Sequence, residues 1–228
     1  MTMAISCRGA TRRYASTGVE PVTAVASVDL DVAAGEFVAI SGPSGSGKTT
    51  LLGLLAGLEP ADEGTVAVLG HDMARLSATE RARLRRTQVG IVFQSFGLIA
   101  SLSAIENVAL PLLLEGIGPA ELKSRARRAL DEVGLADRHD ARLDECSGGE
   151  RQRIGAARAL VIEPAVILAD EPTGSLDNEN ASVVLDLLTA ATRSRGCSLL
   201  LVTHDAATAA RADRRYRMRD GRLEEVAR

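Results

Sequence analysis

The chain has 228 residues, of which 46% are apolar and 25% charged, and this is enough to bury the core of one α/β domain. Aromatic residues make up only 2% and the net charge is −3, which argues against a base-stacking platform or bulk attraction to nucleic acid or anionic lipid. The three cysteines lie far apart without metal-binding spacing, as expected of reduced thiols in the cytosol.

No segment reads as a targeting or membrane-spanning sequence. The first 13 residues lack the apolar stretch of a signal peptide. The apolar run Val108–Leu114 is far too short for a bilayer and contains Pro111. We therefore expect any link to a membrane to come through a partner protein.

The first third of the chain alternates short apolar runs with helical patterns, which is typical of a mainly parallel sheet covered by helices. Alternation over 28–32 predicts a half-exposed strand, and the apolar run 37–41 predicts a buried one. A Gly/Ser loop and an apolar helix over 48–56 follow. Further strands are predicted at 65–69 and 89–93.

The middle third has no convincing strand. Apolar residues at helical spacing predict a helix that starts at Pro119 and stops at Gly134. We interpret residues 95–160 as a helical subdomain inserted between two parts of the α/β core, 1–94 and 161–228.

The α/β pattern then resumes to the end of the chain. A buried strand is predicted at 165–169, a helix at 178–195 and another buried strand at 198–203. Residues 214–226, with a turn at Asp220-Gly221, predict a closing hairpin.

Residues Gly42–Thr49 match the pattern GxxxxGK(S/T) and lie between a predicted strand and a predicted helix. Glycines let successive N–H groups point at phosphate oxygens, and the helix start adds its positive dipole end. Lys48 can bridge β- and γ-phosphates, and the Thr49 hydroxyl can ligate Mg²⁺. The alternative is a chance glycine-rich turn. The residues assigned to phosphate binding are Ser44, Gly45, Ser46, Gly47, Lys48, Thr49 and Thr50.

Two carboxylates, Asp170 and Glu171, end a buried apolar strand. Side chains alternate along a strand, so the two point in different directions from one sheet edge, where such folds bind ligands. One can hold Mg²⁺ while the other reaches an attacking water. The alternative is an acidic pair that opens a surface turn before Pro172.

A second candidate anion site is the turn Cys146-Ser147-Gly148-Gly149-Glu150 before an arginine-rich helix. Ser147 is a natural N-cap, and the glycines expose backbone N–H groups at a helix start. By itself the turn could be only a helix cap.

Taken in order, these motifs resemble the ABC ATPase family, whose signature reads LSGGQ before a basic helix. The resemblance implies ATP and Mg²⁺ as ligands and extends over essentially the whole chain. The residues that it assigns are Tyr14 and Val22 to adenine; Thr49, Gln94 and Asp170 to Mg²⁺; Glu171 as general base with Lys48, Gln94 and His204 in catalysis; Ser175-Leu176-Asp177 to the dimer interface; and Ser147, Gly148 and Gly149 to the ATP of a second chain. Each has an ordinary alternative, such as a surface aromatic for Tyr14, a strand cap for Gln94 and a loop histidine for His204.

The sequence departs from the family signature at two positions. Cys146 replaces the usual Leu, and Glu150 replaces the commonest Gln and adds a negative charge near a phosphate-binding edge. A helix dipole can favour that charge in the first turn. We expect the active sites to function with these two residues, and we expect the affinity for ATP to be the property that the two replacements alter.

The resemblance implies a P-loop NTPase α/β fold with a mainly parallel sheet, an antiparallel β subdomain and an inserted helical subdomain. It implies a head-to-tail homodimer with ATP at the interface, in the cytoplasm on the inner face of the cell membrane, bound to a separate permease chain and not to nucleic acid. The similarity is closest to lipoprotein-release and macrolide- or peptide-export ATPases. The residues expected to contact the permease are Phe96, Leu98, Ile99 and Leu102, and the alternative is that they are subdomain core.

Two other functions remain open. An ATPase of the cell-division type, gating or regulating a membrane partner without moving a substrate, keeps every motif. A soluble ABC protein acting on DNA or ribosomes normally needs a long coiled-coil insertion or two cassettes in one chain, and this chain has neither.

Overall fold

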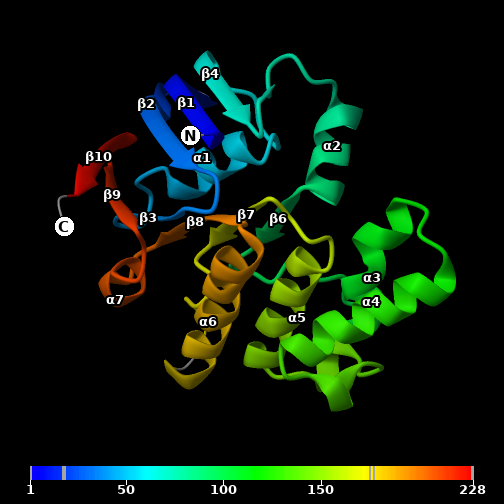
Figure 1. Ribbon diagram of the computed structural model, residues 1–228. Helices are drawn as coiled ribbons and strands as arrows, with labels where there is room; N and C mark the ends of the chain where they lie inside the picture. The colour runs from blue at the N-terminus through cyan, green and yellow to red at the C-terminus, as the bar shows by residue number, and fades with distance from the viewer. Residues whose placement is uncertain (1, 17–18, 175, 177, 227–228) are drawn as a thin grey trace. The chain divides into compact units, whose positions relative to one another are not determined.

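The computed structural model describes residues 2–16, 19–174, 176 and 178–226 (Figure 1). The chain forms two compact units. Unit 1 combines Met1–Ala82 with Ser198–Arg228, and unit 2 is Arg83–Cys197. Helix α2 (Ala78–Thr87) contains the boundary between them.

Unit 1 contains an antiparallel sheet in the order β2-β1-β4-β5. Its strands are β1 (Met3–Ser16), β2 (Val19–Ala33), β4 (Glu63–Val68) and β5 (His71–Asp72). The strand predicted at 28–32 lies within β2, and the strand predicted at 65–69 overlaps β4. The sequence did not suggest β1, because its outward positions are polar and Gly9, with φ 59°, interrupts its alternation.

Unit 1 also holds strands in the order β10-β9-β3-β8, where β3 (Phe37–Ser41) is parallel to both neighbours. They are β8 (Ser198–Thr203) and β9 (Arg214–Arg219). The last strand, β10 (Arg222–Val226), forms the predicted hairpin with β9. The loop after β3 leads into α1 (Lys48–Leu55), and β8 is followed by the short α7 (Ala206–Ala209).

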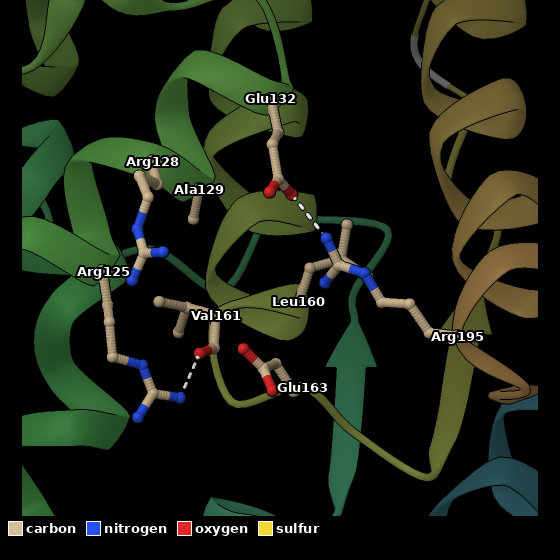
Figure 2. Close-up of a pocket in the computed structure, with 8 residues that line it drawn as sticks. All are labelled: Arg125, Arg128, Ala129, Glu132, Leu160, Val161, Glu163 and Arg195. Carbon is tan, nitrogen blue, oxygen red and sulfur yellow. Dashed lines mark hydrogen bonds and ion pairs between the residues drawn. The ribbon is translucent and has the colours of Figure 1, made fainter.

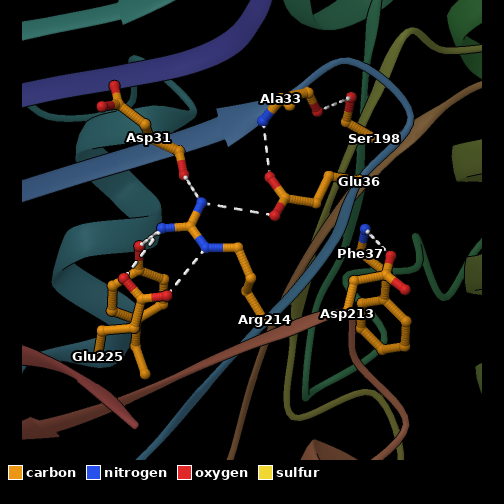
Figure 3. A network of polar contacts seen from close by, with 9 residues as sticks. Asp31, Ala33, Glu36, Phe37, Ser198, Asp213, Arg214 and Glu225 are labelled. Atoms are coloured by element: carbon orange, nitrogen blue, oxygen red, sulfur yellow. Dashed lines mark hydrogen bonds and ion pairs between the residues drawn. The ribbon is translucent and has the colours of Figure 1, made fainter. Parts of the chain in front are cut away.

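A polar network around Arg214 fixes the start of β9 (Figure 3). The guanidinium donates to the Asp31 backbone oxygen at 3.1 Å, to Glu36 at 3.4 Å and to both oxygens of Glu225 at 3.1 Å. This joins β2, the turn before β3 and β10 through one side chain. The hairpin is therefore held beside β3, whose end carries the glycine-rich loop.

Unit 2 contains the parallel strands β6 (Val89–Val92) and β7 (Val166–Asp170). Its helices are α3 (Ala104–Leu114), α4 (Pro119–Glu132), α5 (Gly148–Leu160) and α6 (Asn178–Arg195), with short 3₁₀ turns η1 (Ala136–Arg138) and η2 (Leu143–Glu145). Helices α3, α4 and α5 pack together in Figure 1 around a shared apolar core that includes Val108, Leu130 and Ile154.

These elements confirm the predicted α/β class: β3 pairs in parallel with β8 and β9, β6 pairs in parallel with β7, and the antiparallel sheet β2-β1-β4-β5 is separate. Segment 95–160 holds α3, α4 and α5, but the compact unit 2 also takes in β6, β7 and α6. The subdomain boundaries at 94 and 161 therefore stay a prediction. None of the helices in the described part of the chain has the length and apolar character that crossing a bilayer requires.

Candidate functional site

The glycine-rich loop of unit 1 closes around the ammonium group of Lys48. Its Nζ donates to the backbone oxygens of Gly42 and Pro43, both at 2.8 Å, and the residue is only 7% exposed. A buried cation held by neutral carbonyl dipoles is incompletely compensated and favours an arriving anion.

Backbone geometry explains why glycine stands before this lysine. Gly47 has φ 104°, and a Cβ there would lie 2.0 Å from the Ala24 oxygen. Gly47 is the N-cap of α1 and supplies no side-chain cap, so a ligand in the loop meets the N-terminus of this helix.

A buried hydroxyl in the same loop lacks a partner. Ser46 is 4% exposed, and its Oγ makes no hydrogen bond within the described residues. Buried polar atoms are nearly always satisfied, so this orphan fits a ligand oxygen placed in the loop. The β9–β10 turn also contacts this loop, because the Gly221 N–H donates to the Ser46 backbone oxygen at 3.1 Å.

The structure brings His204 to the same sheet edge as this loop. Ser41 at the end of β3 is in register with Thr203 at the end of β8, so the segments that follow the two strands leave the sheet at the same edge. The Asp205 N–H donates to Thr203 Oγ1 at 3.0 Å, and the Asp205 carboxylate caps α7 by accepting from the Thr208 N–H at 2.8 Å. This turn presents an exposed His204.

Tyr14 and Val22 also meet within unit 1. They are direct partners in the β1–β2 ladder, with exposures of 36% and 58%. The guanidinium of Arg12 lies 5.0 Å from the centre of the Tyr14 ring, and the Tyr14 hydroxyl donates to Glu59. The pair is therefore an oriented, solvent-facing apolar surface that suits a stacked base.

In unit 2 the predicted acids and glutamine come from one edge of the β6–β7 pair. Val92 is in register with Ala169, so Asp170, the last residue of β7, and Gln94, two residues after β6, lie at the same edge of this parallel pair. Asp170 is 8% exposed and Gln94 is exposed. Glu171 is half-buried and has φ 44°. That left-handed conformation costs a non-glycine residue roughly 1–3 kcal/mol, a strain that clusters at functional sites.

The Ser-Gly-Gly turn opens α5 as predicted. Ser147 is the N-cap, and its hydroxyl accepts from the Glu150 N–H at 3.2 Å. A side chain at Gly148 would meet nothing within 4 Å, so the glycine leaves open space above a helix N-terminus. Cys146 is 4% exposed and belongs to the core of α3, α4 and α5; burial raises the pKa of its thiol.

Each unit carries oxygen ligands of the kind that Mg²⁺ binds: the Thr49 hydroxyl in unit 1, and the Asp170 carboxylate and the Gln94 amide in unit 2. The described residues contain no cluster of three or more His, Cys, Asp or Glu able to hold a metal alone. Mg²⁺ typically keeps one or two carboxylates and takes the rest of its shell from phosphates and water.

The other predicted positions are placed only in part. Ser175 and Asp177 lie outside the described residues, while the Leu176 N–H donates to the Thr173 oxygen at 3.1 Å. Of the four residues expected to contact a permease, Leu98 packs against the helical core, Phe96 and Leu102 are half-buried and Ile99 is 43% exposed.

A polar pocket in unit 2 is a second place where charged groups gather (Figure 2). Two of its arginines bind within the protein, since Arg195 pairs with Glu132 at 2.8 Å and Arg125 donates to the Val161 oxygen at 2.9 Å. Glu163 and Arg128 add one charge of each sign. The near balance of charges assigns no ligand to this pocket. Its lining residues are Arg125, Arg128, Ala129, Glu132, Leu160, Val161, Glu163 and Arg195.

Comparison with known proteins gives a consistent result. Residues 25–174 match the model of a family described as ABC transporter. The ATP-binding protein LolD of the lipoprotein-releasing system of Chromohalobacter salexigens is 44% identical over 223 residues, which are 98% of this chain and 94% of the relative.

Two solved structures are similar to nearly the whole chain. The dimeric, post-hydrolysis ATP-binding cassette MJ0796 with ADP and phosphate superposes with a TM-score of 0.91 at 35% identity, covering 98% of this chain and 99% of that one. The cbiO1 protein of Clostridium perfringens, part of the cbiONQ ABC transporter complex, superposes with a TM-score of 0.85 at 25% identity, covering 98% and 88%.

Proposed function

The chain belongs to the ABC transporter family, and we propose that it hydrolyses ATP to drive a separate membrane permease in lipoprotein release. The observation that carries ATP binding is the loop around Lys48, with its buried ammonium and the orphaned Ser46 hydroxyl. The choice of lipoprotein release follows the 44% identity to LolD along nearly the full length of both chains.

Each predicted residue has a role in this proposal. Lys48 and the N–H groups at the start of α1 hold the phosphates. Thr49, Gln94 and Asp170 would hold Mg²⁺, which would neutralise phosphate charge. Glu171 orients or deprotonates the attacking water. His204 and Lys48 offset the charge that develops on the γ-phosphate.

We propose that the catalytic unit is a head-to-tail dimer. A single chain has one lysine loop and one Ser-Gly-Gly turn, and the turn of one copy closes on the γ-phosphate held by the other copy. The cassette MJ0796 is described as a dimer with ADP and phosphate, in support of this arrangement. ATP then joins two copies and its hydrolysis separates them, which is a ligand-driven population shift.

We expect Tyr14→Ala to raise the KM for ATP by roughly 5- to 100-fold, the scale of losing one base-stacking contact, with kcat changed much less. Tyr14→Phe should stay within a few-fold of wild type, because it keeps the ring that Arg12 covers. Steady-state ATPase kinetics of the two variants measure this difference. Equal KM values for the two variants would contradict the assignment of Tyr14 to the adenine site.

An apolar groove on the helical segment supports the permease partner. Its volume is about 350 Å³, and it lies between α3, the α3–α4 connection and the start of α4. Leu113 lines it and is 60% exposed, so the groove presents an apolar side chain to a partner. We propose that a short cytoplasmic helix of the permease docks on this groove and on Ile99, and places the chain at the inner face of the membrane.

Charged substitutions test this docking surface. We expect Leu113→Asp and Ile99→Asp to cut copurification with the permease subunit by at least about tenfold, as burying an unpaired charge in an interface does. Leu114→Asp is the matched control, because Leu114 is 61% exposed but does not line the groove. Basal ATPase activity should be retained in all three. Equal capture by all three variants would contradict docking at this groove.

A further inference from the structure

Glu150 is the charged residue of the turn Cys146–Glu150. Its carboxylate is turned back on the helix start, where one oxygen accepts from the Ser147 N–H at 2.7 Å. The Ser147 hydroxyl in turn accepts from the Glu150 N–H at 3.2 Å, which completes a capping box. The two side chains therefore hold each other at the start of α5.

The other carboxylate oxygen of Glu150 meets Arg138. The Arg138 Nε donates to Oε1 at 3.0 Å, and the Glu150 side chain is 16% exposed. Hydrogen bonds from the Ser147 N–H and the Ser147 side chain, and then the charge of Arg138, lower the pKa of Glu150, so the group is ionised at neutral pH. Both oxygens are therefore engaged, and a positive charge lies beside the negative one.

Arg138 is held where this pairing needs it. It ends the 3₁₀ turn η1, and its N–H donates to the Leu135 oxygen at 3.1 Å. Its oxygen accepts from the Ala141 N–H at 3.2 Å. Leu135 is 2% exposed in the core of α3, α4 and α5, so the turn is anchored to the same core as the start of α5.

We propose that Arg138 is a charge-compensating and positioning residue for ATP: it neutralises Glu150 and keeps the Ser-Gly-Gly turn able to accept a γ-phosphate. This rests on the proposed function, in which that turn meets the ATP of a second copy. An isolated carboxylate beside a helix N-terminus cancels the positive potential that attracts phosphate. The Arg138 guanidinium offsets that carboxylate through a charge-assisted hydrogen bond.

A double-mutant cycle tests the pair in full-length Glu171→Gln protein, in which the expected slow turnover keeps ATP bound. The measurement is the ATP concentration that gives half-maximal dimer by sedimentation velocity, with Mg²⁺ present. We expect Arg138→Ala to raise it roughly tenfold, the scale of one screened unit charge near a phosphate. Glu150→Gln should change it by less than about threefold, because it removes the charge and leaves an amide oxygen for the Ser147 N–H.

The decisive variant carries both changes. If Arg138 acts through the charge of Glu150, Arg138→Ala with Glu150→Gln returns to within about threefold of the parent, and the defect of Arg138→Ala alone shrinks at high salt. Arg142→Ala is the matched control, since it removes a nearby arginine whose side chain pairs with Asp144 at 3.8 Å. It should match the parent.

Two results would overturn the inference. One is a double variant as impaired as Arg138→Ala, which would make Arg138 a structural prop independent of charge. The other is an Arg138→Ala protein that dimerises like its parent. A parent that does not dimerise with ATP at all would instead overturn the proposed function, and this inference with it.

Discussion

Glu171→Gln is expected to lower ATP turnover by roughly 10² to 10⁴, the usual contribution of a positioned general base. The change keeps the shape of the side chain and removes the group that orients or deprotonates water. Because ATP still binds, the variant should accumulate as an ATP-bound dimer. Phosphate-release kinetics and sedimentation velocity with ATP measure the two effects.

Glu163→Gln is the matched control for this change. Glu163 is also a glutamate in the left-handed conformation, with φ 51°, but it lines the polar pocket of unit 2. Its variant should hydrolyse ATP at the parent rate and form no lasting dimer. Normal turnover in Glu171→Gln would show that another group is the base.

Lys48→Ala is expected to lower kcat/KM for ATP by roughly 10² to 10³, the range found when one preorganised donor to a transition-state oxyanion is removed. The buried ammonium that the Gly42 and Pro43 oxygens hold is lost, and with it the charge that meets the phosphates. No closed dimer should accumulate with ATP. This outcome separates a binding defect from the hydrolysis defect of Glu171→Gln.

Lys123→Ala supplies the control for the lysine. Lys123 is exposed on α4, so its loss should leave the ATPase activity of the isolated chain unchanged. Thermal unfolding of the Lys48→Ala protein checks that the loop remains folded. A Lys48→Ala protein that binds and hydrolyses ATP normally would contradict the role of this loop.

The parts of the site that could be predicted from the sequence are contiguous motifs. Gly47 and Lys48 have to adopt one loop conformation between a buried strand and a helix, so eight neighbouring positions carry the information. The capping serine of α5 and the apolar strand before Asp170 are equally local. Parallel strand pairing then brings these local motifs to common sheet edges. In unit 2 it places Gln94 and Asp170 at one edge, and in unit 1 it places the lysine loop and His204 at one edge.

What the sequence could not give depends on distant or weakly patterned residues. Strand β1 alternates poorly because Gly9 and several arginines interrupt it, so its pairing with β2 and β4 was not foreseen. Arg138 lies 12 residues before Glu150 in an irregular connection, and no periodicity links the two. Leu98, expected at a permease contact, packs on the helical core, because apolar residues at an interface and in a core look alike in sequence.

The roles of Gln94, Asp170, Glu171 and the Ser-Gly-Gly turn stay predictions. The role of Ser175 and Asp177 at the dimer interface also stays a prediction. Their common premise is that ATP is shared between two copies. The structure of the Glu171→Gln protein with ATP and Mg²⁺ tests this most directly. We expect Ser147 and Gly149 of one copy within hydrogen-bonding distance of the γ-phosphate bound by Lys48 of the other. A dimer in which the turn lies far from every phosphate would contradict it.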